Sequence, residues 1–84
     1  MSDDPDAATV AAAIMAMAAM RGEGRSFCPS EVARRLAADW RPLLPRIRAT
    51  AAELVCAGRL EATQRGRAVD PLAARGPIRL KRPG

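Results

Sequence analysis

The chain of 84 residues contains no histidine and no tyrosine, one phenylalanine, one tryptophan and two cysteines. Histidine is the commonest general base and the commonest zinc ligand, and two cysteines alone cannot complete a tetrahedral zinc site. Cys28 has no histidine to activate it as a nucleophile, and Gly22-Glu23-Gly24 lacks the third glycine of a phosphate loop. A domain of this size also has no room for a deep substrate cavity. We therefore expect no enzyme, no catalytic residues, no cofactor and no bound metal.

Two further classes of protein are disfavoured. The apolar run of residues 7–20 follows an acidic lead, which is the wrong charge for a signal peptide, and it is too short to cross a bilayer. Two cysteines are also too few for a secreted disulfide scaffold. We expect a single soluble, cytoplasmic domain over residues 1–84, with no membrane partner and with flexible tails at 1–4 and 81–84.

Positive charge is unevenly distributed along the chain. The formal net charge is +5 and the isoelectric point is near 11.0. Residues 1–33 carry a net charge of −3, whereas residues 34–84 carry +8. A GC-rich codon usage explains the preference for arginine over lysine, but not this clustering. The second half of the chain is therefore expected to attract polyanions.

Three helices are expected in the first two thirds of the chain. In the first, Asp4 is expected to cap a helix that has Pro5 at its first position and buries Val10, Ile14, Met17 and Met20. The second begins at Pro29, with Cys28 and Glu31 as a capping box, and ends near Ala38. Asp39 is expected to cap the third, which has Pro42 and Pro45 in or before its first turn and ends at Gly58.

The core-facing stripe of the third helix is expected to be Leu44, Ile47, Ala51, Leu54 and Val55, with Arg48 at its edge. Arg46, Ala49, Thr50, Glu53 and Cys56 are expected to point away from the core.

After Gly58 the hydrophobic period changes from that of a helix to that of strands. Residues 60–64 and 67–69 alternate around Arg65-Gly66, which predicts a hairpin whose turn needs the positive φ of Gly66. Residues 77–80 are expected to be a short extended segment. The expected elements follow one another as helix, short strand, helix, turn, helix and hairpin. This order predicts a mainly α winged helix-turn-helix of three helices and a wing.

Several short motifs also resemble a family of small, uncharacterised bacterial winged-helix-like proteins. These motifs are the segments 27–33 (FCPSEVA), 39–41 (DWR), 58–60 (GRL) and 75–79 (RGPIR), and the resemblance extends over about residues 8–80. It implies the winged-helix fold. The function of that family is unknown, so the resemblance carries over no binding or catalytic residues.

The favoured function is binding to duplex DNA, with transcription regulation as the role. In winged-helix proteins the third helix enters the major groove and the wing contacts the flanking backbone. By that analogy, the residues expected to contact DNA are Ser30, Arg41, Arg46, Arg48, Thr50, Arg65 and Arg67. Ser30 is included among these residues because the N-terminus of the second helix can hold a phosphate through its backbone amides. Glu53 argues against this reading unless its carboxylate accepts a hydrogen bond from cytosine.

The alternative is a protein-interaction module with no role in nucleic-acid binding. The outer face of the first helix carries Ala11, Ala12, Met15 and Ala19, so a homodimer or another protein partner could cover it. The scarcity of aromatic side chains disfavours single-stranded nucleic acid as a ligand. A solvated basic face without any ligand is the remaining explanation of the arginines.

Overall fold

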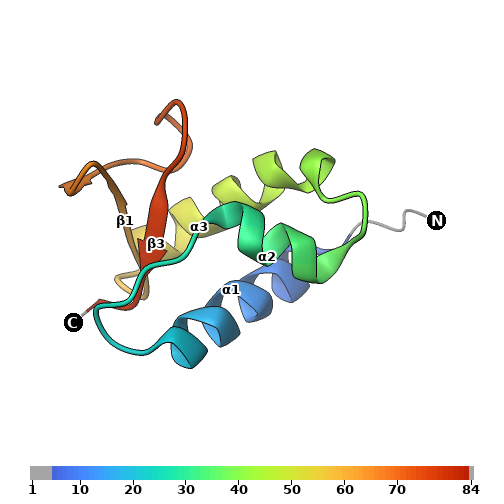
Figure 1. Ribbon diagram of the computed structural model, residues 1–84, viewed down its shortest axis with the longest axis horizontal. Helices are drawn as coiled ribbons and strands as arrows, with labels where there is room; N and C mark the ends of the chain where they lie inside the picture. Colours follow the sequence, from blue (N-terminus) through green and yellow to red (C-terminus); the bar gives the residue numbers. More distant parts are fainter. Residues whose placement is uncertain (1–4, 84) are drawn as a thin grey trace.

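A computed structural model describes residues 5–83 and contains three helices followed by a small antiparallel sheet (Figure 1). The elements are α1 (Ala7–Arg21), α2 (Pro29–Leu36), the 3₁₀ helix η1 (Arg41–Leu43), α3 (Leu44–Cys56), β1 (Glu61–Gln64), β2 (Arg67–Ala68) and β3 (Arg79–Lys81). The mainly α class is confirmed, and the arrangement is compatible with a winged-helix-like fold.

Helix α1 begins later than the sequence pattern predicts. The side chain of Asp6, not Asp4, caps the helix by accepting a hydrogen bond from the Thr9 amide at 2.8 Å. Asp4 lies outside the described residues, and Pro5 precedes the helix instead of opening it. The buried stripe is Val10, Ile14, Met17 and Ala18. Because the buried face ends on Ala18, the expectation for Met20 is wrong: its side chain is 66% exposed and contacts Arg35 at the surface.

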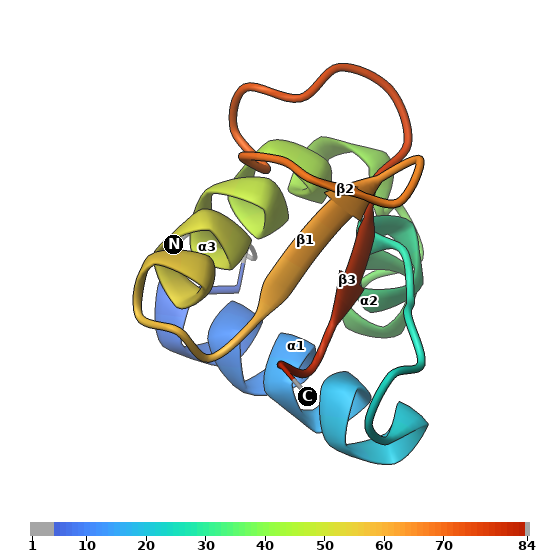
Figure 2. The same ribbon diagram turned by 90° about the vertical axis from the view of Figure 1, so that its left-hand side faces the viewer.

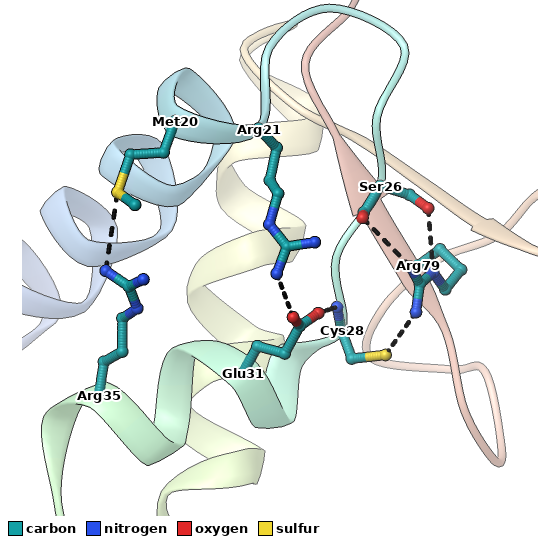
Figure 3. Close-up of polar contacts among 7 residues, drawn as sticks. All are labelled: Met20, Arg21, Ser26, Cys28, Glu31, Arg35 and Arg79. Atoms are coloured by element: carbon teal, nitrogen blue, oxygen red, sulfur yellow. Dashed lines mark hydrogen bonds and ion pairs between the residues drawn. The ribbon is translucent and has the colours of Figure 1, made fainter.

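The start of α2 is confirmed as a capped N-terminus (Figure 3). The Cys28 amide donates to Glu31 Oε2 at 2.7 Å, and Arg21 at the end of α1 forms an ion pair with the same carboxylate. Leu36 is the last helical residue, two positions before the predicted end at Ala38. The cap therefore joins the C-terminus of α1 to the N-terminus of α2.

This cap predicts a pH dependence of folding. The Cys28 amide holds the pKa of the Glu31 carboxyl below its ordinary range, and the Arg21 guanidinium adds to the effect against the opposing contribution of burial. The resulting stabilisation is fully present above the ordinary pKa of a glutamate, about 4.3. It is lost as the pH falls below that value and through the lowered pKa of Glu31, because there the unfolded chain binds more protons than the native one. We expect Glu31→Gln, which keeps a hydrogen-bond acceptor, to show a smaller loss of stability in urea between neutral pH and about 3.5. Equal losses in this variant and in the wild type would contradict this role of Glu31, and Glu23→Gln serves as the control.

Helix α3 follows η1 with its prolines where expected. Pro42 lies in η1 and Pro45 in the first turn of α3, where no intrahelical amide is needed. Asp39 is not a cap, since Trp40 occupies the N-cap position of η1 and makes no side-chain hydrogen bond there. The helix buries Ile47, Ala51 and Leu54, among others, against the other two helices and the sheet.

The sheet is larger than the expected hairpin. Its order is β2-β1-β3, with Thr63 opposite Ala68 on one side and Glu61 opposite Lys81 on the other. The stub at Phe27 adds to the far edge of β3 through reciprocal backbone hydrogen bonds with Leu80 of 2.8 and 2.7 Å. Arg79 and Leu80 of the segment predicted as extended therefore belong to a paired strand, and the expected tail at 81–84 is wrong for Lys81.

One core connects these elements. Phe27, the only phenylalanine, is fully buried together with Ile14, Val32 and Ile47 from the helices and Leu80 from the sheet. All three helices contribute to it, and Figure 2 shows the sheet lying across them. Packing in this core therefore fixes where α3 lies relative to residues 65–78, which connect β1 to β3.

Candidate nucleic-acid interface

The wing is the connection of residues 65–78 between the paired strands β1 and β3, and it includes β2. It begins with the expected tight turn, in which Arg65 and Gly66 have φ of 54° and 80°. These two successive positive φ values are typical of a type I′ hairpin turn. After β2 the chain arches over α3 before it returns to β3 (Figure 2).

Arg48 of α3 holds the wing in place. Its guanidinium donates to the carbonyl oxygens of Ala74 at 2.8 Å, Gly76 at 2.5 Å and Pro71 at 3.5 Å. This guanidinium is thus engaged by protein carbonyls, and the residue is half-buried. Arg48 therefore anchors the wing, a role that the sequence could not reveal because its partners lie 23–28 residues away, and its contact with DNA stays a prediction.

Thr50 requires a correction. Its side chain is only 5% exposed, although the helical wheel places it outside the hydrophobic stripe. Helix α3 packs extensively against α1, and the buried surface extends further around α3 than the stripe of large apolar residues indicates. A side chain buried to this extent offers no contact to a base edge, so Thr50 leaves the candidate interface.

Arg46 lies on the exposed side of α3, as expected. Its Nη1 donates to the Pro5 carbonyl at 2.6 Å, so the side chain also ties α3 to the segment that precedes α1. The guanidinium has further donors, and it remains available to an anion beside this contact.

Arg41 lies at the corner between α2 and α3, where two guanidiniums flank the Trp40 ring. The guanidinium carbon of Arg41 is 4.7 Å from the ring centroid and that of Arg34 is 4.8 Å away. Both distances lie within cation–π range. Trp40 is half-buried against the core, as expected for an anchor at this corner. Arg34 was not predicted as part of the site, because only the fold brings it to Trp40.

Ser30 lies in the first turn of α2 and lines a hollow of about 230 Å³. The same hollow is lined by Trp40 and Leu44 at the corner, and by Arg48 and Pro77 at the base of the wing. The structure therefore brings the start of α2, the start of α3 and the wing together around one depression. Ser30 lies within this depression, half-buried.

Arg65 and Arg67 both project from the tip of the wing and are exposed. Among residues 5–83 the ion pairs are Arg21–Glu31 and Lys81–Glu61, so neither wing arginine is neutralised by a carboxylate there. Arg65, Arg67, Arg41 and Arg46 are thus the predicted contact residues that remain exposed.

The outer face of α1 is only partly available for a partner. Met15 and Ala11 are half-buried against the core, whereas Ala12 and Ala19 are exposed. A protein partner or a second copy on this face remains a prediction.

No group of three or more metal-ligating side chains is present within residues 5–83. Over the same range, no helix is long and apolar enough to span a membrane.

The sequence matches, over residues 7–83, the family described as "Protein of unknown function (DUF3253)". No curated protein matches the chain.

Proposed function

The chain belongs to the DUF3253 family of proteins of unknown function, and from its geometry we propose that it binds duplex DNA. The observation that carries this proposal is the group of exposed arginines on the wing and at the start of α3. Arg65 and Arg67 provide the wing contribution, and Arg41 and Arg46 the contribution of η1 and α3. Four such guanidiniums would neutralise about four phosphates.

We also propose that the chain belongs to the winged-helix superfamily, and the order of its elements supports this. Three helices precede a sheet of order β2-β1-β3, and the stub at Phe27 pairs with its edge. In winged-helix proteins the third helix enters the major groove while the wing contacts the adjacent backbone. The side of α3 that carries the exposed Arg46 and Ala49 would face the major groove. The backbone amide of Ser30, at the start of α2, would donate a hydrogen bond to a phosphate.

Contacts to phosphates dominate this proposed interface. Ala49 is small and lets the helix approach the bases, but it offers no hydrogen bond, and Glu53 favours only a cytosine amino group. We therefore propose that most of the binding free energy comes from the backbone of the DNA and depends little on its sequence. Transcription regulation is the role in which we propose that this binding is used.

Fluorescence anisotropy of a labelled random duplex of about 25 base pairs tests the proposal. At about 50 mM salt we expect saturable binding with a Kd in the micromolar range, as for other non-specific contacts of this size. An unlabelled duplex should compete, and single-stranded DNA of equal length should compete less well. No anisotropy change at about 100 µM protein would refute DNA binding and would favour a protein partner instead.

A further inference from the structure

A groove of about 770 Å³ lies between the outward side of α3 and the part of the wing that passes over it. Small residues of α3, including Ala49, Ala52 and Cys56, form one wall, and Val69, Pro71 and Leu72 form the other. Its volume lies within the range of small-molecule sites, which are mostly apolar with a few polar groups.

The wall formed by the wing is held in place before any ligand arrives. Pro71 is fully buried, and Asp70 Oδ1 accepts a hydrogen bond from the Leu72 amide at 2.9 Å. Arg48 fixes the carbonyls on both sides of the arch, as described above. The groove is therefore a preformed feature, and binding there would not require ordering of the wing.

The charge of the groove is opposite to that of the molecule. Glu53 and Asp70 are the two carboxylates that line it, and no arginine or lysine lines it. Both are exposed at the surface, and neither forms an ion pair with another residue of the described range 5–83. An apolar surface with an acidic edge, in a protein of net charge +5, selects against anions and favours cations.

We propose that this groove binds a small apolar organic cation. The apolar body of the ligand would lie against the alanines of α3 and against Val69 and Leu72, with its positive charge toward Glu53 and Asp70. A protein partner fits less well, because a specific interface buries about 800 Å² on each side. Among the described residues only Met20 and Leu72 are large apolar side chains with high exposure, and only Leu72 lines the groove.

Two isosteric probes of opposite charge test this proposal with the full chain. Isothermal titration with tetraphenylphosphonium should show one saturable site, bound at least about tenfold more tightly than tetraphenylborate. The two carboxylates attract the cation and repel the anion, and their partial exposure to solvent limits the size of the difference. The net charge of the protein alone predicts the opposite preference. Equal or tighter binding of tetraphenylborate would overturn the proposal.

Variants locate the site. Glu53→Gln/Asp70→Asn should weaken tetraphenylphosphonium binding about tenfold, whereas Glu23→Gln/Asp39→Asn makes the same change in net charge away from the groove and should have little effect. Ala49→Leu, at an exposed position of α3, should fill the groove and abolish binding without loss of helix. Binding that survives either groove variant would refute this location. If an amphipathic leucine–lysine peptide binds more tightly than tetraphenylphosphonium and competes with it, the occupant is instead a protein segment.

Ala49 and Glu53 line this groove and also lie on the side of α3 that we propose to face DNA, so the organic cation and the duplex would compete for that side. The titration contains no DNA, so a failure to bind the cation and a failure to bind DNA are distinguishable.

Discussion

An Arg65→Asn/Arg67→Thr variant is expected to bind duplex DNA about a hundredfold more weakly than the wild type at about 50 mM salt. Each phosphate contact releases about 0.9 of a counterion, which at this salt concentration is worth about tenfold in affinity. Removal of two contacts therefore accounts for the expected loss. Anisotropy titration of the same labelled duplex measures it.

The two substitutions are chosen to leave the wing folded. Arg65 has a φ of 54°, and asparagine adopts this conformation more readily than most residues, so the variant carries an Asn-Gly type I′ turn. Threonine suits the exposed strand position of Arg67. An unchanged thermal unfolding temperature would show that any loss of affinity comes from the charges.

The matched control is Arg25→Gln/Arg35→Gln, which removes two exposed arginines from the end of the molecule where α1 and α2 meet. It makes the same change in net charge, and we expect less than a threefold loss of affinity. Equal losses in the two double variants would mean that net charge, and not the wing, determines binding. That result would contradict the proposed interface.

An Arg48→Met variant is expected to destabilise the protein by about 2 kcal/mol and to release the wing. It leaves the carbonyls of Pro71, Ala74 and Gly76 without their charged donor, and hydrogen bonds to charged groups contribute about 1.5–3 kcal/mol when buried. The site is only half-buried, which reduces this value. For a domain of this size the change corresponds to a decrease in Tm of roughly 10 °C.

Urea unfolding and limited trypsin digestion measure the effect on stability and on the wing, respectively. Cleavage of the variant at Arg65, Arg67 or Arg75 should accelerate before global unfolding, because a released wing exposes its backbone. Arg59→Met, at another exposed arginine, should leave both measurements unchanged. If Arg48→Met is as stable and as protease-resistant as Arg59→Met, the anchoring role of Arg48 is wrong.

Local sequence signals predicted the parts of the fold that depend on neighbours in the chain. Pro29 and Glu31 mark the start of α2 because a capping box needs only four residues. Gly66 marks the wing turn because a tight hairpin needs positive φ there. The helical period likewise placed Ile47 and Leu54 in the core.

The errors concern residues whose environment is set by distant segments. Thr50 is buried because the packed face of α3 is wider than its stripe of large apolar residues, which a single helical wheel cannot show. Lys81 belongs to β3 because its partner Glu61 lies 20 residues earlier in the chain. Arg48 lies at the edge of the core-facing stripe of α3, as predicted, but its carbonyl partners lie in the wing. The acidic groove was missed for the same reason, since Glu53 and Asp70 come together only when the wing crosses α3.

The salt dependence of duplex binding tests the central proposal most directly. Four phosphate contacts, made by Arg41, Arg46, Arg65 and Arg67, predict that the logarithm of the association constant falls with the logarithm of salt concentration with a slope of about −4. For the Arg65→Asn/Arg67→Thr variant the predicted slope is about −2. The same slope in both proteins, or a wild-type slope near zero, would contradict the proposal that the wing and α3 bind the DNA backbone.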